Sequence, residues 1–319
     1  MLSYKTKQYL VATLKVSVVI ASYLFIYFRI VTNDALTFEV FQTTIEESSL
    51  FKIQNIIVLV LLTCLNWGFE ILKWKTLAAV VSKIRVNQSA KHVLTAQAVS
   101  LCTPFKIGEY GTKTLFFLKK QAKKVVFLNF LGNMSQLAAT LFFGSIGLGV
   151  YISNQFPEFT LAYFVLFLLT MLSVVLSYPF WKKMNFLMGN FTLRNIQNFS
   201  ATISKKIKQK VLGFAFLRYM VFSLQFCFIM NCLIPISIVE VLPFVFLMYL
   251  ISSAIPLLQF FDVVIKGSVA ILVFSDFNDL IVLSVTTLMW LFNAVLPAII
   301  GSYFVLTFNE KPLLNPEKL

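Results

Sequence analysis

The sequence predicts an all-α polytopic membrane protein, with about six transmembrane helices and two re-entrant helical hairpins in an inverted repeat. The chain of 319 residues is 59% hydrophobic and only 13% charged, whereas soluble proteins average about half apolar and a quarter charged. Several apolar runs reach about 20 residues, the length that crosses a hydrocarbon core of about 30 Å. Two further apolar stretches carry charged residues, proline and glycine at their centres.

The basic residues between the apolar runs predict the orientation of the spans. Lysine and arginine gather on alternate loops, and the loops between these carry mainly aspartate and glutamate. Cytoplasmic loops are rich in Lys and Arg, so the protein is expected in a cell (inner or plasma) membrane with both termini on the cytoplasmic side. The whole chain, 1–319, is expected to form one transmembrane domain with a cytoplasmic basic loop at 181–210. The predicted spans are 8–31, 53–72, 125–152, 159–180, 211–235 and 280–307.

The stretch 93–118 is predicted to enter the membrane and return to the same side. Lys106, Glu109 and Lys113 lie in its middle, together with Pro104 and two glycines. Broken backbone at membrane depth is tolerated only where protein or a water-filled cavity satisfies its polar groups. Each arm of about 13 residues, roughly 20 Å as a helix, is too short to span. A single crossing would also carry the four lysines that follow to the outer side, against the charge pattern.

A second stretch of this kind, 239–274, carries Asp262 and Lys266 in its middle and is flanked by acidic residues. It is expected to enter from the opposite side, although its first arm, 239–258, is also long enough to span fully. The two halves of the predicted repeat are 53–152 and 211–307. Each half has an acid four residues before a lysine, which places both side chains on one helical face.

Inverted repeats whose broken helices meet near the midplane are typical of secondary transporters. Four cations and two carboxylates leave a positive surplus, which suits a phosphate-bearing ligand. The alternative is that each acid–lysine pair only holds two helices together. The candidate substrate-binding residues are Lys106, Glu109, Lys113, Asp262, Lys266 and Arg218.

Several other polar residues in the predicted spans have more than one interpretation. Asn129, Asn133 and Gln136 fall on about one helical face, where they line a cavity or form hydrogen bonds between helices. Glu70 is expected to pair with Lys73, three residues later on the same helix.

A glycine-rich segment and the single histidine are interpreted as structural features rather than as ligand or catalytic sites. Gly144, Gly147 and Gly149 indicate close helix packing rather than a phosphate-binding loop, because they follow a membrane helix and not a strand. His92 is expected to lie at the cytoplasmic border of the membrane.

The run SLCTPFKIGEYGTKTLFF, residues 100–117, resembles the transmembrane region of the lysylphosphatidylglycerol synthase family of flippase-like integral membrane proteins. The resemblance is carried by the pattern P-x-K-x-G-E-x-G-x-K, from Pro104 to Lys113, and by the Asn- and Gln-bearing helix that follows. It implies a membrane protein that translocates amphiphilic lipids, with Lys106, Glu109 and Lys113 as cavity residues. The family's soluble aminoacyl-transferase domain is missing from this sequence, so no aminoacylation is expected.

These patterns predict a flippase-like transporter of an anionic or phosphate-bearing lipid, including polyprenyl-phosphate-linked molecules. The alternative is a non-transporting scaffold or accessory subunit of an envelope-lipid biosynthetic enzyme, which would dock through 181–210. The sequence contains no nucleophile–base set or acidic metal cluster, so neither an enzyme nor a cofactor is expected. Anionic headgroups and the positive-inside bias explain the net charge of +14 better than nucleic acid does. A homo-oligomer or an envelope-lipid enzyme partner is compatible with these patterns.

Overall fold

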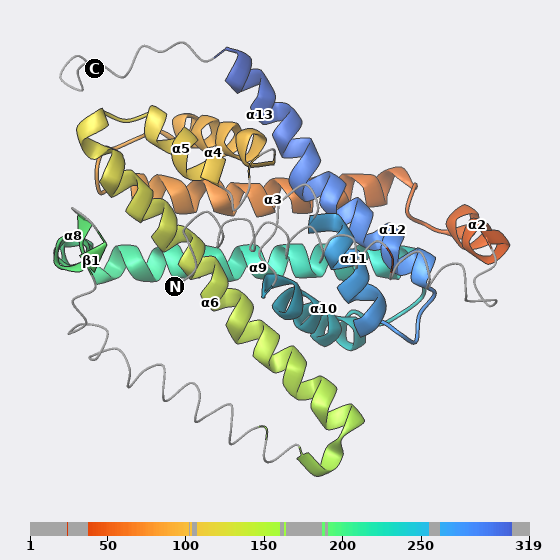
Figure 1. Cartoon of the computed structure of the whole chain (residues 1–319). Coiled ribbons are helices and arrows are strands. Elements are labelled where there is room, and N and C mark those ends of the chain that lie inside the picture. The colour runs from red at the N-terminus through yellow and green to blue at the C-terminus, as the bar shows by residue number, and fades with distance from the viewer. Residues whose placement is uncertain are drawn as a thin grey trace.

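The computed structural model describes residues 24, 38–101, 103, 107–159, 163, 187–188, 191–254 and 262–307. Almost all of the predicted spans 8–31 and 159–180 lies outside these ranges. In the described part the chain is helical apart from one two-stranded antiparallel ribbon (Figure 1). The elements are α2 (Phe38–Glu47), α3 (Ile53–Ala78), α4 (Val86–Leu101), α5 (Ile107–Leu115), η2 (Lys119–Gln121), α6 (Ala122–Gln155), η3 (Pro157–Phe159), β1 (Leu187–Met188), β2 (Phe191–Thr192), α8 (Leu193–Thr202), α9 (Lys205–Leu233), α10 (Ile238–Ser253), α11 (Asp262–Val273), α12 (Asp279–Trp290), the π-helix η5 (Leu291–Val295) and α13 (Leu296–Leu306).

Four described helical segments are long and apolar enough to cross a membrane. They match the predicted spans 53–72, 125–152, 211–235 and 280–307, with ends that differ by a few residues. Large apolar side chains stay exposed along them, as expected for surfaces that face lipid rather than water. The four segments are Ile53–Ala78, Lys119–Gln155, Lys205–Leu233 and Asp279–Leu306. The protein is thus an all-α protein with at least four helices suited to a membrane.

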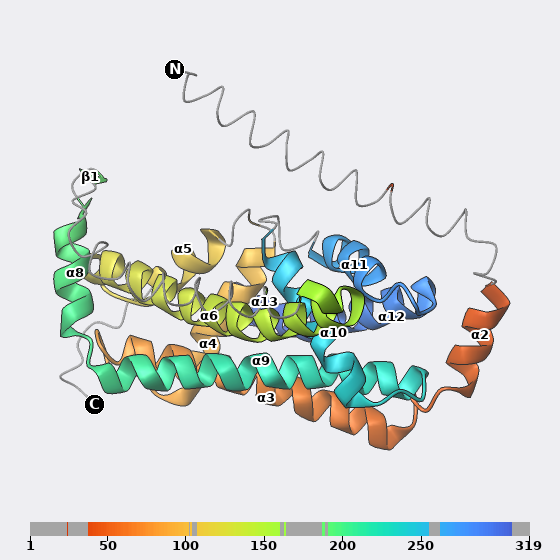
Figure 2. The same cartoon turned by 90° about the horizontal axis from the view of Figure 1, so that it is seen from below.

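The helices form two layers, which Figure 2 shows from the side. Helices α3 and α9 lie side by side in one layer and run in opposite directions, while α6, α10, α11 and α12 form the other layer. The largest apolar core lies where α9 meets α10, α11 and α12. Its fully buried members include Phe226, Ile229, Met230, Val245, Ala270, Val282 and Val285.

Each predicted hairpin region contains two short helices in its described part. Helices α4 and α5 pack against each other and have 16 and 9 residues, about 24 and 14 Å at ~1.5 Å per residue. Helix α10, also of 16 residues, ends before the predicted limit of 258 and packs against α11. None of these helices reaches the ~30 Å of a hydrocarbon core. The hydroxyl of Thr103 accepts a hydrogen bond from the Gly108 N–H at 2.9 Å, so this threonine caps the start of α5.

Glycines set the closest helix crossings. A Cβ at Gly147 of α6 would collide with the backbone carbonyl of Pro243 in α10, and Gly144 abuts Leu250 of the same helix. A Cβ at Gly301 of α13 would collide with the carbonyl of Leu94 in α4. Small residues let membrane helices approach closely. The interpretation of Gly144 and Gly147 as packing residues is therefore confirmed.

Replacing Gly147 by leucine is expected to destabilise the fold, because the new side chain meets the backbone of α10 rather than a movable side chain. Overpacking of this kind costs about 1–3 kcal/mol, and thermal unfolding of the detergent-solubilised protein measures it. The matched control is Gly213→Leu, since nothing lies within 4 Å of a Cβ at Gly213 on α9. Equal unfolding temperatures for the two variants would contradict this account of the crossing.

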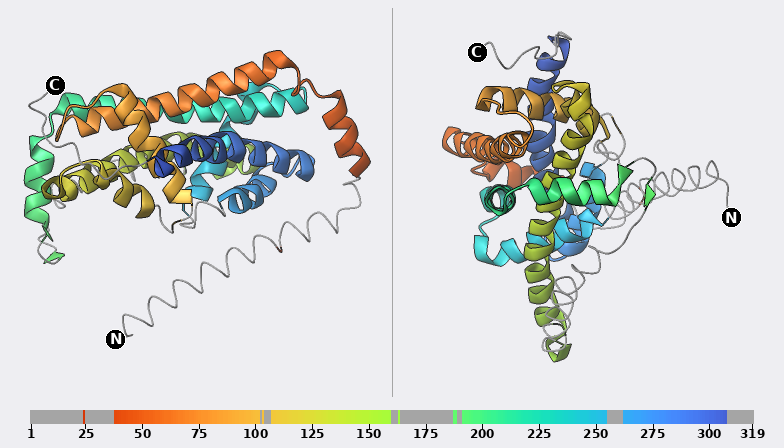
Figure 3. Two further views of the ribbon diagram at one scale, coloured as in Figure 1. Left: turned by 90° about the horizontal axis from the view of Figure 1, so that it is seen from above. Right: turned by 90° about the vertical axis from the view of Figure 1, so that its left-hand side faces the viewer.

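The predicted basic loop 181–210 contains regular secondary structure in its described part. Strands β1 and β2 pair within it, α8 follows, and α9 already begins at Lys205 because the hydroxyl of Ser204 caps its first turn, accepting from Ile207 N–H at 3.3 Å. Figure 3 shows α8 standing across the end of α9. The Lys124 ammonium lies over the Phe199 ring at 5.5 Å, so α8 is tied to the basic start of α6.

Candidate functional site

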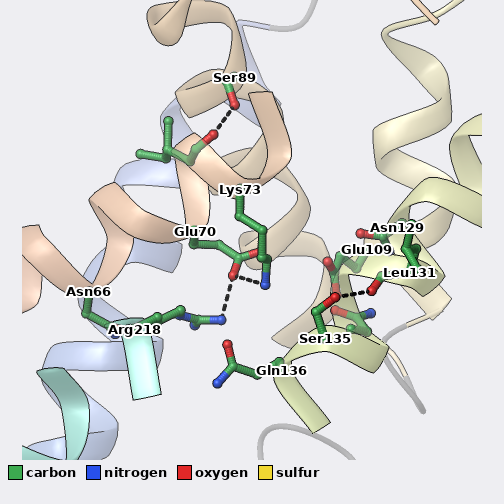
Figure 4. Close-up of polar contacts among 12 residues, drawn as sticks. Asn66, Glu70, Lys73, Ser89, Glu109, Asn129, Leu131, Ser135, Gln136 and Arg218 are labelled. Atoms are coloured by element: carbon green, nitrogen blue, oxygen red, sulfur yellow. Dashed lines mark hydrogen bonds and ion pairs between the residues drawn. The ribbon is translucent and has the colours of Figure 1, made fainter. Parts of the chain in front are cut away.

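A buried carboxylate on α3 holds two cations. One oxygen of Glu70, Oε2, lies 2.6 Å from Lys73 Nζ and 2.6 Å from Nη1 of Arg218 on α9 (Figure 4). The side chain of Lys73 is 2% exposed and that of Glu70 is 9% exposed. The predicted Glu70–Lys73 pair is confirmed. Sequence analysis missed the partner of Arg218, which is Glu70 rather than a residue of either hairpin.

A ladder of amide side chains continues from this ion pair across three helices. Arg218 Nε donates to Asn66 Oδ1 at 3.1 Å, and Asn66 Nδ2 donates to Asn293 Oδ1 at 2.5 Å. Asn293 Nδ2 donates to Gln225 Oε1 at 2.9 Å, and Gln225 Nε2 donates to Thr63 Oγ1 at 2.9 Å. Asn293 lies in the π-helix η5, a kind of element found often at functional sites. The ladder holds α3, α9 and the α12–α13 segment together.

The predicted Glu109–Lys113 pair forms on α5 and is extended by α6. Lys113 Nζ lies 2.7 Å from Glu109 Oε1 and donates to Asn129 Oδ1 of α6 at 2.7 Å. It also lies 4.4 Å from the ring centroid of Trp74 on α3, within the range of a cation–π contact. The lysine side chain is 2% exposed. Lys113 therefore joins the hairpin helix to both neighbouring spans.

The polar face of α6 carries Asn129, Asn133 and Gln136, for which the sequence allowed either a cavity lining or hydrogen bonds between helices. Asn129 accepts from Lys113, and Asn133 Nδ2 donates to the hydroxyl of Tyr110 at 3.1 Å. These two residues form hydrogen bonds between helices. Gln136 differs, because both polar atoms of its side chain are buried and have no hydrogen-bond partner among the described residues.

His92 is buried against the same group of side chains. Its Nδ1 accepts a hydrogen bond from Trp74 Nε1 at 3.4 Å, and its ring stacks on Phe116 at 4.1 Å. The imidazole thereby supports the indole over which Lys113 lies.

The ion pairs of α3 and α5 both lie against α6, the first at Gly132 and the second at Asn129. A Cβ at Gly132 would lie 3.7 Å from Lys73 Cε, and Figure 4 shows Glu109 near Asn129, and Glu70 and Arg218 nearer Gln136. We call the two ion pairs, together with Asn129 and Gln136 of α6, the central polar cluster. Its charged members are Glu70, Lys73, Glu109, Lys113 and Arg218. Three cations and two carboxylates leave a surplus of one positive charge in the described part of the protein.

The predicted Asp262–Lys266 pair forms on α11, at 2.5 Å, but it is half-exposed. The Lys266 ammonium lies 5.5 Å from the ring centroid of Tyr249, which in turn contacts Tyr219. Within the described ranges this pair makes no contact with the central polar cluster. The structure therefore brings together Glu109, Lys113 and Arg218 but not the α11 pair. Lys106 lies outside the described residues.

No protein-family model matches this chain, and no curated protein matches it in sequence. The resemblance to the lysylphosphatidylglycerol synthase transmembrane region stays a prediction that depends on the motif from Pro104 to Lys113.

Proposed function

We propose that this protein is a flippase-type transporter that moves an anionic or phosphate-bearing amphiphilic lipid across a cell (inner or plasma) membrane. The observation that carries the proposal is the central polar cluster, which lies between three membrane-suited helices, α3, α6 and α9, and the short helix α5. Ionisable groups at membrane depth are costly and mostly functional. A surplus positive charge in such a place favours a negatively charged ligand.

The packing of the helices supports an inverted repeat with re-entrant hairpins. The first half would consist of α3, α4, α5 and α6, and the second of α9, α10, α11 and the α12–α13 segment. Exchanging the halves maps the observed contacts onto one another: α4 packs on α13 as α10 packs on α6, and α5 packs on α6 as α11 packs on α12. Gly301 and Gly147 lie at the equivalent crossings. Repeats of this kind move against each other in transporters.

The distribution of charge supports the proposed orientation. The C-terminus of α3 and the N-termini of α6 and α9 lie at one end of the bundle (Figure 1). Lysines cluster at that end, and Asp279 begins α12 at the other. By the positive-inside rule the lysine-rich end faces the cytoplasm. The α4–α5 hairpin would then enter from the cytoplasm, and the α10–α11 hairpin from outside.

In the proposed transport step a lipid phosphate competes with carboxylates for the cluster's cations. Lys113 and Arg218 already have counterions in Glu109 and Glu70, so the ligand would exchange partners with them rather than meet bare charges. Such exchange keeps the burial cost of each charge low along the path. Lys106, Asp262 and Lys266 would extend the polar path through the two hairpins, and the lipid tails would stay in the bilayer.

The test is lipid movement by the purified protein. Reconstituted into liposomes with a fluorescent anionic phospholipid in trace amounts, the protein is expected to speed exchange between leaflets well above protein-free vesicles. A labelled zwitterionic lipid is expected to move more slowly, because the cluster carries a positive surplus. Exchange equal to that of protein-free vesicles for every lipid would contradict transport and favour the scaffold alternative.

A further inference from the structure

The central polar cluster contains side-chain polar atoms that have no hydrogen-bond partner among the described residues. Lys73 Nζ lies in an ion pair with Glu70 but has no further partner within the described ranges, although an ammonium has three donors. Its side chain is 2% exposed, so bulk water does not reach it. Most buried polar groups in proteins have partners, and each exception asks for an explanation.

Two amides on α6 add to this set. Asn129 is 2% exposed; its Oδ1 accepts from Lys113, while its Nδ2 has no partner in the described part of the chain. Neither polar atom of the Gln136 side chain has a partner among the residues that the structure describes, and in Figure 4 this amide points toward the Glu70–Arg218 ion pair. Gly132, which faces Lys73, lies between them at helical spacing. Three side chains with unused hydrogen-bonding capacity among the described residues therefore lie where α6 meets α3.

The charge of the cluster indicates how much negative charge a ligand would carry. Among the described residues, three cations and two carboxylates leave one uncompensated positive charge in a buried site, which is costly without a counterion. A phosphodiester carries one negative charge, whereas a phosphomonoester carries about 1.5 to 2 at neutral pH. One negative charge balances the cluster, and two would leave it negative.

The site is also within reach of a ligand. The side chains of Arg218 and Glu109 are 21% and 13% exposed, so the cluster reaches the protein surface at these two residues. A headgroup could approach these two residues while its acyl chains stay outside the protein.

We propose that Lys73, Asn129 and Gln136 bind the phosphodiester of a singly charged anionic lipid headgroup. Their free N–H groups would donate to its non-bridging oxygens, as charge-assisted hydrogen bonds. This proposal rests on the proposed function in naming its substrate class, but binding is measured separately from transport.

Tryptophan fluorescence provides the binding assay. Trp67 lies under Arg218, at 5.6 Å, and Trp74 under Lys113, at 4.4 Å, so occupancy of the cluster should change their emission. With the full-length protein in detergent, short-chain phosphatidylglycerol is expected to give a saturable response. Short-chain phosphatidic acid, inorganic phosphate and phosphatidylcholine are expected to bind at least about tenfold more weakly. Inorganic phosphate or phosphatidic acid binding as tightly as the diester would overturn the assignment.

The matched variants are Gln136→Leu and Gln225→Leu, two glutamines that differ in their partners. Q136L is expected to weaken phosphatidylglycerol binding about tenfold, the effect of one hydrogen bond to a charged group. It should also leave the unfolding temperature of the ligand-free protein unchanged or higher, because it removes unpaired buried polar atoms. Q225L breaks formed hydrogen bonds, so it should lower the unfolding temperature and keep the affinity.

The outcomes separate this site from the transport proposal. Q136L that unfolds at a lower temperature and binds the lipid normally would show that Gln136 has a structural partner, and the site would be rejected. Tight, Gln136-dependent binding by a protein that moves no lipid would support the site and remove the transport function. Transport without measurable diester binding would support the transport function and reject the site.

Discussion

Replacing Glu70 by glutamine is expected to lower the free energy of unfolding by about 3–5 kcal/mol, the cost of breaking a buried ion pair by removing one partner. Glu70 is the shared counterion of Lys73 and Arg218. Without it, two cations lie side by side in the bundle with no carboxylate between them. Thermal or denaturant unfolding of the detergent-solubilised protein measures the loss.

Two further variants test the cause. Adding Lys73→Met to Glu70→Gln removes one stranded charge and is expected to restore part of the stability, as a coupling term in a double-mutant cycle. Asp262→Asn is the comparison, because the Asp262–Lys266 pair is 37% and 32% exposed and exposed pairs contribute about 0–1 kcal/mol. If Glu70→Gln costs no more than Asp262→Asn, the cluster is not held together by charge.

Replacing Lys113 by methionine is expected to abolish transport of the labelled anionic lipid, down to the rate of protein-free vesicles. Lys113 is the cation that joins the α4–α5 hairpin to α6, through Glu109 and Asn129. Methionine keeps an unbranched apolar side chain but removes the charge that lies over Trp74. The measurement is leaflet exchange in liposomes that contain equal amounts of folded protein, verified by gel filtration.

Glu109→Gln is expected to have the same effect on transport, because it leaves Lys113 without the carboxylate that a ligand would displace. The control is Lys120→Met, which removes an exposed lysine at the basic end of the bundle and should preserve exchange. Normal transport by folded Lys113→Met would mean that the buried pair only joins helices.

The interior of the protein was partly predictable from the sequence. Hydrophobic length alone locates four spans, and the breaks at 93–118 and 239–274 follow from charged residues and helix breakers within apolar stretches. The pairs Glu109–Lys113, Asp262–Lys266 and Glu70–Lys73 were predictable because residues three or four apart share a helical face. These are local properties, and local sequence determines them.

Only the tertiary structure decided which pairs belong to one site. Arg218 meets Glu70 across 148 residues, and Asn66 meets Asn293 across 227. Such contacts depend on how each helix is rotated about its axis and how far it is shifted along its neighbour. A one-residue change in the helical face turns a side chain by about 100°. The sequence therefore determined which charges enter the bundle, and helix packing determined that Glu109, Lys113 and Arg218 meet there, while Asp262 and Lys266 remain half-exposed on α11.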